Sequence, residues 1–335
     1  MKQSLLTILC WLALFLTNGQ DIHFSQFDKA PTNLNPALTG NFEGQWRFSA
    51  NQRSQWRSVS RSFNTFGFGA ENNEQKLVKN LYHGVNYMND VAGDGDYRTH
   101  EFNITNAYKV ALGDDGKKVL TAGLQLGINH KAIDFNAFQY DAQFNGYKYD
   151  ANLPSNEVFL NERYTNLNLG FGLLFSQLLN NELSYEVGVG SFNLLPQKQG
   201  FFGVPAIIRD RRLTVHGSAV YQLEKEWHLM PGFLFQTQGV YRELVIGSNI
   251  RYTQRDSKSE YVAPYAGLWF RTKDAVNIVA GLYYNNWVAG VSYDINMSEL
   301  TPASNVRGGL EFSFQYILNI FKPELKQYRL CPDYL

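Results

Sequence analysis

The sequence predicts an all-β protein: an antiparallel transmembrane β-barrel of about fourteen strands, preceded by an N-terminal plug or periplasmic segment. Apolar and polar residues alternate with a period of two from residue 45 onward, which indicates strands whose two faces meet different surroundings. The alternating segments are about 9–13 residues long, which is close to the length that a tilted strand needs to cross a bilayer. Aromatic residues make up 15% of the chain and gather at the ends of these segments, as the interface girdles of a barrel do.

Residues 1–19 have the composition of an export signal. Lys2 gives a basic start, an apolar run extends from Leu5 to Leu16, and small or polar residues follow it. A single transmembrane anchor and a lipoprotein signal at Cys10 are the alternatives. The apolar run of about 12 residues is short for an anchor, which needs about 20. We therefore predict a signal peptide over 1–19 and a mature protein that contacts outer-membrane lipid.

Residues 20–44 form the N-terminal segment and contain the stretch NLNPALTG. The Asn35-Pro36 pair breaks a helix, because proline removes a backbone donor and biases the preceding residue toward an extended shape. Gly40 permits a sharp turn into the first strand. We expect this segment to act as a plug or strand-entry clamp, on the periplasmic side or folded into the barrel mouth.

The barrel is predicted over 45–316. In LTAGLQLGINH, Leu124, Leu126 and Ile128 fall on one face, and Gln125 and Asn129 fall on the other. A soluble sandwich also alternates, but a second face rich in Gly, Asn, Gln and charge is typical of a polar lumen. The predicted segments centre near residues 49, 66, 85, 104, 125, 170, 187, 217, 233, 248, 265, 279, 290 and 311. The aromatic residues expected at the membrane interfaces include Trp46, Tyr108, Trp227, Tyr261, Trp269, Tyr283 and Trp287.

Connection lengths predict the orientation of the barrel. The longest predicted connections, 133–161, 193–210 and 295–305, each follow an odd-numbered segment, whereas short connections follow even-numbered ones. Outer-membrane barrels keep short turns on the periplasmic side and long loops outside. We therefore predict that both ends of the barrel, and a C-terminal tail over 317–335, lie in the periplasm.

The sequence gives no positive sign of catalysis, and we expect neither a metal nor a cofactor. No histidine pair has zinc-ligand spacing, and the Asp/Gly-rich NDVAGDGDYR lacks the ligand spacing of an EF-hand, so it is expected to be a turn. An outer-membrane hydrolase that uses His216 with Ser218 is the enzymatic alternative, but no motif singles out that pair. The 30 Lys+Arg and 30 Asp+Glu balance, so no nucleic-acid partner is expected, because phosphate binding needs a net basic face.

Two short motifs mark the start of the mature chain. The first combines Phe-Ser-Gln at 24–26 with Leu-Asn-Pro-Ala at 34–37 and Gly40. The second is NQRSQW, which contains Arg53 and Trp56. Each motif is weak alone, and the order and spacing of several motifs along the chain carry more weight.

Further motifs continue in order along the chain. YMNDVAG supplies an Asn-Asp-x-x-Gly turn with Asn89, Asp90 and Gly93, and GVSYDINMSEL contains Asp294. In order and spacing these motifs resemble the PorP/SprF family of outer-membrane proteins, which is tied to the type IX secretion and gliding machinery of the Bacteroidetes. The chain departs from the family pattern at Asp94, where proline is usual.

The resemblance implies a non-enzymatic outer-membrane component that assists export or surface attachment of a secreted cargo protein through the cargo's C-terminal sorting domain. It also implies coupling to the periplasmic ring components PorK and PorN, for which NLNPALTG is a candidate contact. The motif residues become candidates for structural roles or partner contacts; they are Asn35, Pro36, Gly40, Arg53, Trp56, Asn89, Asp90, Gly93 and Asp294.

The long connections around 133–161 and 193–210 are expected to face outward and contact cargo. The stretch DFNAFQYDAQFNGYKYD is dense in Phe, Tyr and Asn, a composition suited to protein recognition. The candidate contact residues are Phe138, Tyr140, Phe144, Tyr147 and Tyr149. The alternative is that these aromatics only pack the loop onto the barrel mouth.

A porin-like passive channel is the alternative function. A lumen enclosed by about fourteen strands with a polar wall admits water. A conducting porin usually has segregated charge at a constriction. The inward charges expected here, such as Glu186, Arg251, Arg307 and Glu311, are mixed in sign, which suits a plugged lumen as well.

Overall fold

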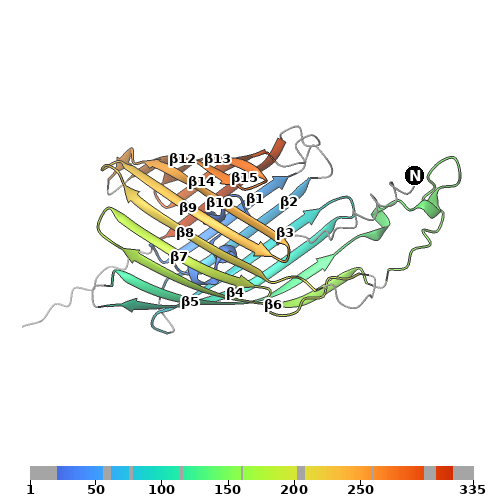
Figure 1. Cartoon of the computed structure of the whole chain (residues 1–335), viewed down its shortest axis with the longest axis horizontal. Helices are drawn as coiled ribbons and strands as arrows, with labels where there is room; N and C mark the ends of the chain where they lie inside the picture. The colour runs from blue at the N-terminus through green and yellow to red at the C-terminus, as the bar shows by residue number, and fades with distance from the viewer. Residues whose placement is uncertain are drawn as a thin grey trace, which may run out of the picture.

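Long antiparallel strands form the wall of the molecule (Figure 1). The computed structural model describes residues 21–55, 62–74, 78–113, 116–159, 161–201, 208–257, 260–297 and 307–319. The wall strands are β1 (Trp46–Gln55), β2 (Phe63–Asn72), β3 (Leu81–Ala92), β4 (Tyr97–Leu112), β5 (Lys118–Ala132), β6 (Arg163–Leu178), β7 (Leu183–Phe192), β8 (Arg212–Gln222), β9 (Trp227–Gln238), β10 (Tyr241–Tyr252), β12 (Tyr261–Arg271), β13 (Ala275–Tyr284), β14 (Trp287–Asn296) and β15 (Arg307–Leu318).

The sheet closes on itself. Consecutive wall strands pair antiparallel, and the first strand β1 pairs with the last strand β15. The short β11 (Arg255–Asp256) lies beside β12 in the connection from β10, while β10 and β12 pair directly. The result is a closed 14-strand antiparallel barrel, and every predicted segment centre falls within one of its strands, so the predicted fold class and strand count are confirmed.

The alternation of side chains gives the barrel an apolar outside and a polar inside. Leu126 on β5 is 53% exposed on the outer face, whereas its neighbour Gln125 is 3% exposed in the lumen. The outer face therefore presents branched and aromatic side chains to lipid, as the sequence pattern predicts.

The two rims of the barrel differ in the length of their connections. At the proximal rim, where β1 begins and β15 ends, Trp46 pairs with both Asn72 and Leu318. This rim also carries the short connections 113–117, 179–182 and 223–226. The opposite, distal rim carries the long connections 133–162, 193–211 and 297–306, as predicted.

A belt of aromatic side chains surrounds the outer face near the proximal rim. Trp287 lies 4.2 Å from Tyr316 and Trp227 lies 4.7 Å from Tyr252 between ring centroids. These rings are exposed at strand ends, which is where a barrel meets the membrane interface.

Two aromatic residues expected at the interface point inward instead. Trp269 is only 7% exposed and donates its indole N–H to Oδ1 of Asn249 at 2.9 Å. Tyr283 packs against Tyr265 inside the lumen, with centroids 5.3 Å apart. The prediction was wrong for this pair, because each falls on the lumenal parity of its strand rather than on the outward parity.

Within the residues that the structure describes, helical structure is confined to short turns. The N-terminal segment contains η1 (Phe27–Lys29), α2 (Pro31–Leu34) and η2 (Pro36–Leu38), and the 133–162 connection contains η3 (Phe135–Ala137) and η4 (Asp141–Gln143). Pro31 and Pro36 each stand at a helix start, where the missing N–H costs nothing. No helix in the described ranges is long and apolar enough to cross a membrane.

Candidate functional site

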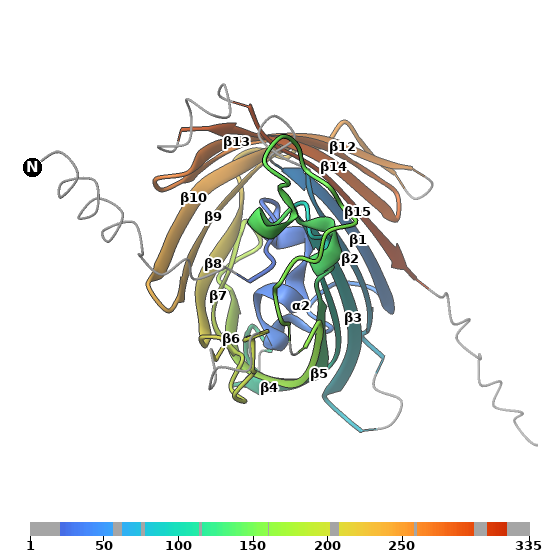
Figure 2. The same ribbon diagram turned by 90° about the vertical axis from the view of Figure 1, so that its right-hand side faces the viewer.

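The N-terminal segment, residues 21–44, runs through the lumen from one rim to the other, and we call it the plug. Its first described backbone N–H, at Asp21, donates to Oε1 of Gln238 at the distal end of β9 (2.9 Å). Its Gly40 N–H donates to Oε2 of Glu71 at the proximal end of β2 (3.0 Å). Figure 2, which looks along the barrel, shows this segment and α2 inside the ring of strands. The plug therefore occupies the lumen over its height.

The stretch NLNPALTG forms the proximal half of the plug. Asn35 is fully buried, and its Oδ1 accepts the backbone N–H of Ala37 at 2.9 Å, which caps η2. Its Nδ2 donates to the backbone oxygen of Leu173 on β6 (3.0 Å) and lies 3.0 Å from Nε2 of His216 on β8. A single amide side chain thus fixes both the turn at Pro36 and the contact with the wall.

Glycines in the wall let the plug backbone approach closely. A Cβ at Gly123 on β5 would lie 2.2 Å from the Ala37 nitrogen and 2.3 Å from the Pro36 carbonyl carbon. A Cβ at Gly172 on β6 would lie 1.9 Å from Oδ1 of Asn35. The Asn35-Pro36 turn therefore packs against the glycines on the lumenal face of β5 and β6.

An arginine–carboxylate pair holds the proximal end of the plug. Arg47 donates to both oxygens of Glu71, from Nε at 3.0 Å and from Nη2 at 2.9 Å. Glu71 also accepts the N–H of Gly40, whose φ of +68° belongs to the left-handed region that favours glycine. This arrangement explains why the motif ends on Gly40.

A second ionic cluster joins the plug to β1, β14 and β15. These strands lie at the seam, where the first and last strands pair and the barrel closes. Arg53 on β1 donates to Oδ2 of Asp294 (3.0 Å) and to the backbone oxygen of His23 in the plug (2.8 Å). Glu311 on β15 accepts the backbone N–H groups of Ser25 and Gln26 at 2.7 and 2.9 Å. The predicted residues Arg53 and Asp294 thus meet each other. Arg53 contacts the plug at His23, and Asp294 accepts a hydrogen bond from the Ser25 hydroxyl of the Phe-Ser-Gln motif at 2.8 Å.

A third cluster anchors the distal end of the plug. Arg209, in the 193–211 connection, donates to Asp21 at 2.7 Å and to Glu101 at 2.9 Å. Burial by itself would raise the pKa of the Asp21 carboxyl, but Arg209 and Arg212 outweigh burial and lower the pKa to about 2. Asp21 is therefore a buried anion whose charge the arginines stabilise.

The remaining motif residues lie apart from these clusters. Asn89 and Asp90 belong to β3, so the expected Asn-Asp-x-x-Gly turn is wrong for them, and only Gly93 lies in the turn, with a φ of +67°. Asp90 accepts a hydrogen bond from Thr65 on β2 at 2.6 Å. Asn89 and Asp90 lie in a strand rather than in a turn because β3 continues to pair with β4 for two residues past Asp90. Trp56 lies outside the described residues.

Aromatic packing holds the base of the 133–162 connection at the distal mouth. Phe135 stacks on Phe159 with centroids 3.7 Å apart and meets Phe201 edge-on at 5.8 Å. Phe138 fills the space above Gly95, and Tyr140 donates its hydroxyl to the Phe135 backbone oxygen at 2.7 Å. The predicted residues Phe138 and Tyr140 thus pack the loop.

The tip of the same connection is exposed. Tyr147 is 96% exposed and Phe144 is 57% exposed. A bridge pairs Phe144 with Tyr149, and Oδ1 of Asn145 accepts the N–H groups of Tyr147 and Lys148 at 3.1 and 3.0 Å. These three aromatics lie on a small hydrogen-bonded turn of the connection between β5 and β6, which extends beyond the strands of the barrel (Figure 1).

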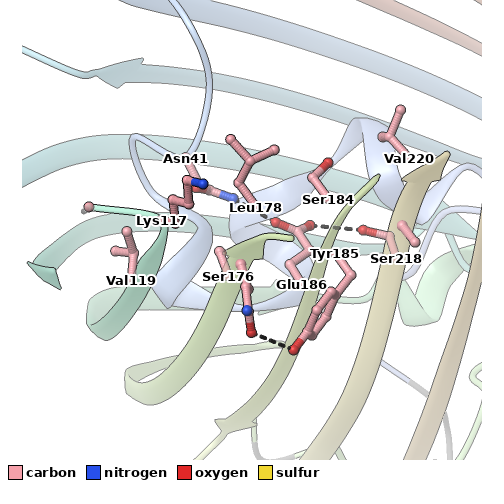
Figure 3. Close-up of a pocket in the computed structure, with 13 residues that line it drawn as sticks. Asn41, Lys117, Val119, Ser176, Leu178, Ser184, Tyr185, Glu186, Ser218 and Val220 are labelled. Atoms are coloured by element: carbon pink, nitrogen blue, oxygen red, sulfur yellow. Dashed lines mark hydrogen bonds between the residues drawn. The ribbon is translucent and has the colours of Figure 1, made fainter. Parts of the chain in front are cut away.

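A cavity of about 420 Å³ opens at the proximal rim between β5, β6, β7 and β8 (Figure 3). Glu186 lies at its base, where it accepts hydrogen bonds from Asn41 of the plug (2.8 Å) and from Ser218 (3.0 Å). Leu178 and Val220 stand at the cavity wall. The plug thus contributes the floor of a space that is open to the proximal side.

No arrangement in the described part of the chain indicates a catalytic or metal centre. The residues of the hydrolase alternative are held by different partners, His216 beside Asn35 and Ser218 on Glu186. Within the described ranges, no group of three or more His, Cys, Asp or Glu residues could hold a metal ion.

Several residues of these clusters escaped the sequence prediction. Asp21, Glu71, Arg209 and Arg271 were not singled out, although each is a buried charge. Glu71 and Arg271 stand at lumenal positions of predicted strands, so period-two parity is the signal that could have found them. For Asp21 and Arg209, which lie outside the strands, the sequence carries no comparable signal.

Solved structures of two toluene transporters are similar in fold. The toluene transporter TbuX of Ralstonia pickettii has a TM-score of 0.51 at 10% identity, covering 90% of this chain and 96% of that one. The toluene transporter TodX of Pseudomonas putida has a TM-score of 0.50 at 7% identity, again covering 90% and 96%. At these identities the likeness shows the fold alone.

No curated protein matches the sequence. Residues 16–316 match the family model of the "Type IX secretion system membrane protein PorP/SprF". That range includes the described plug, all fourteen wall strands except the last two residues of β15, and the three long connections of the distal rim. The chain therefore belongs to the PorP/SprF family of type IX secretion system membrane proteins.

Proposed function

We propose that this protein is a non-enzymatic outer-membrane component of the type IX secretion system that retains a cargo protein at its distal rim. In this proposal the distal rim faces outward, the proximal rim faces the periplasm, and the periplasmic ring components PorK and PorN couple to the proximal rim. Family membership supports the secretion role. The distribution of long and short connections supports the orientation.

The observation that carries the cargo role is the aromatic tip, in which Phe144 and Tyr147 are exposed and Tyr149 is half-buried. Ordered aromatic side chains bind partners at low entropic cost and dominate the energetics of many protein interfaces. The tip is held by its own hydrogen bonds, and its base is fixed by the Phe135–Phe159 stack. Such a tip can bind the sorting domain of a cargo without a change in the barrel.

The test replaces the tip and leaves the base intact. The double variant Phe144→Ser, Tyr147→Ser should lose most surface-retained cargo, measured by surface labelling of the cargo and by co-purification in mild detergent. Val158→Ser is the matched control, because Val158 is a 77% exposed apolar residue of the same connection. Heat-modifiable migration checks that both variants fold as barrels. Unchanged cargo retention in the double variant, or in a deletion of residues 136–150, would sink the cargo assignment.

The coupling to the ring has a separate test. The wild-type protein, extracted in mild detergent, should co-purify with PorK and PorN, and mass spectrometry should identify both. Recovery of cargo without either ring component would remove the coupling from the proposal and leave cargo retention standing.

A porin-like passive channel is the competing function, and the polar lumen wall favours it. The plug opposes it, because Asn35, Ala37 and Thr39 are fully buried between wall strands. The wild-type protein in planar bilayers should therefore show few and small current steps. Large, stable open-channel currents would favour the channel.

A further inference from the structure

The carboxylate at the base of the proximal cavity, that of Glu186, differs from six other lumenal carboxylates. Those of Asp21, Glu71, Glu101, Glu243, Asp294 and Glu311 each lie within 4.0 Å of an arginine. Glu186 has only two neutral donors, Asn41 and Ser218. In the described part of the chain it forms no ion pair, and a carboxylate accepts about four hydrogen bonds. Acceptor capacity and charge thus remain available at Glu186.

Neither of the two lysines near Glu186 forms an ion pair with it, although Lys109 is close enough to interact with its charge. Lys109 donates to the backbone oxygen of Gly40 at 2.7 Å and lies 4.3 Å from the centroid of the Tyr82 ring, which holds its ammonium on the plug. Lys117 is exposed at the cavity mouth and makes no ion pair with Glu186 (Figure 3). A further cation can therefore approach the carboxylate from the proximal side.

The shape of the cavity suits a long side chain with an apolar stem. Val119, Leu178 and Val220 line its wall, and Glu186 lies below them (Figure 3). Lysine and arginine bury their methylene stems along apolar surface and keep the charged end on a polar group. The volume of about 420 Å³ exceeds one such side chain, so part of its backbone also fits.

The rim beside the cavity carries exposed charges of both signs. Glu182 follows β6, and Glu224 and Glu226 follow β8, while Lys117, Lys118 and Lys225 are exposed in the same set of turns. The two glutamate-bearing turns are neighbours, because the N–H of Gln222 donates to the backbone oxygen of Glu182 at 2.8 Å. Selection of a cation therefore depends on Glu186 rather than on the rim.

We infer that the cavity binds a lysine or arginine side chain, carried on an extended segment of a partner protein that docks at the proximal rim. The amine or guanidinium donates to Glu186, and the stem lies between Leu178 and Val220. This inference deepens the proposed coupling at the proximal rim and rests on it.

The test uses short probe peptides and the full protein in mild detergent. Fluorescein-labelled acetyl-Ala-Ala-Lys-Ala-Ala, its arginine counterpart and its norleucine counterpart are titrated at low ionic strength, with anisotropy as the signal. The two basic peptides should bind about tenfold more tightly than the norleucine peptide, because a charge-assisted hydrogen bond to a half-buried carboxylate is lost in the latter.

Glu186→Gln should abolish that preference, because the amide keeps the shape of the side chain and loses its charge. Glu182→Gln is the matched control on the exposed rim and should change affinity by less than about threefold. Lys117→Ala should bind the basic peptides at least as tightly as wild type, since a like charge leaves the mouth. Heat-modifiable migration shows whether each variant is folded.

Two results would overturn the inference: equal binding of the basic and norleucine peptides, or equal losses in Glu186→Gln and Glu182→Gln. Co-purification of PorK and PorN with the wild-type protein is measured in parallel. If the ring components are recovered while the peptides show no preference, the cavity assignment fails and the proposed coupling stands.

Discussion

Arg53 shows how one side chain can serve the barrel and the plug together. It is 2% exposed, and its guanidinium contacts Asp294 on β14 and the His23 backbone of the plug. Its Nε also lies 3.8 Å from Glu311. The residue that marks the NQRSQW motif therefore neutralises two buried carboxylates at the seam.

Replacing Arg53 with methionine should be strongly destabilising, because Asp294 and Glu311 would lose a buried countercharge. Breaking a buried ion pair by removing one partner costs about 3–5 kcal/mol. The free energy of unfolding in urea, measured on the refolded barrel, checks this value. Arg98→Met is the control, because Arg98 is 54% exposed, and it should stay within about 0.5 kcal/mol of wild type. Equal losses in the two variants would contradict the role of Arg53.

Through its charge, Asp21 makes the free energy of unfolding depend on pH in the acidic range. Its pKa is about 2 in the folded protein and 3.8 in its ordinary state, so folding favours the charged form. The contribution is fully present above pH 4 and is lost as pH falls through 2; it amounts to about 2 kcal/mol. Asp21→Asn should remove this contribution at pH 7 and flatten the loss of unfolding free energy between pH 4 and pH 2. An unchanged acid profile in the variant would refute the assignment.

At the residue scale, the sequence indicates which positions face the lumen but not which residues meet. Period-two parity places Glu186 and Glu311 inward, and the structure finds both there. The partners of Glu311 are backbone N–H groups of the plug, 286 and 285 residues away in sequence. No local pattern encodes a contact at that distance, so the role of the Phe-Ser-Gln motif emerges only from the fold.

At the scale of the element, the plug depends on the absence of side chains in the wall. Valine at Gly123 would place its Cβ within 2.3 Å of two plug backbone atoms, which cannot yield as a flexible side chain does. We expect Gly123→Val to displace the Asn35-Pro36 turn and to lower the free energy of unfolding by about 1–3 kcal/mol. The barrel should then show frequent current steps in planar bilayers, because the turn no longer fills the lumen. Planar-bilayer recording and protease access to the plug measure the change.

Gly170→Ala is the matched control for Gly123→Val. Its Cβ would first meet the Phe192 ring at 3.1 Å, at a distance from which a side chain can move aside. This variant should show few and small current steps in planar bilayers, as the wild-type protein is expected to do. Currents of the same size in both variants would show that the barrel, rather than the displaced turn, had been disturbed.

The strands could be predicted one by one, whereas the plug could be predicted only as one of two alternatives and without its contacts, for a physical reason. A strand of the wall carries its own signature, because lipid and lumen select alternate residues along its length. The plug is made of short turns whose burial depends on contacts with β5, β6, β8 and β15. The motif NLNPALTG predicts a stiff turn at Asn35-Pro36. The position of that turn inside the lumen is set by its contacts with the closed barrel, which the motif does not encode.

At the scale of the whole molecule, the two rims present different chemistry. The distal rim carries the exposed aromatic tip at Tyr147, and the proximal rim carries the cavity above Glu186 and charged turns of both signs beside it. The barrel separates these surfaces by the height of the membrane. Two partners could therefore be bound at once without touching each other.

The proposed orientation can be tested by labelling single cysteines in intact cells. In a Cys331→Ser background, Tyr147→Cys should react with a membrane-impermeant maleimide, and Lys225→Cys, in the exposed β8–β9 turn, should react only after the outer membrane is permeabilised. The reverse pattern would invert the barrel and, with it, the assignment of the two rims.

The bonds between the plug and β15 make sealing of the lumen depend on the strand that closes the ring. Ser25 and Gln26 bond to Glu311 on β15, and β15 is the strand that pairs with β1. A chain truncated after β14 loses these bonds and keeps those of Asp21, Asn35 and Gly40 to other strands. Such a chain should leave residues 21–44 more open to protease than the complete chain does.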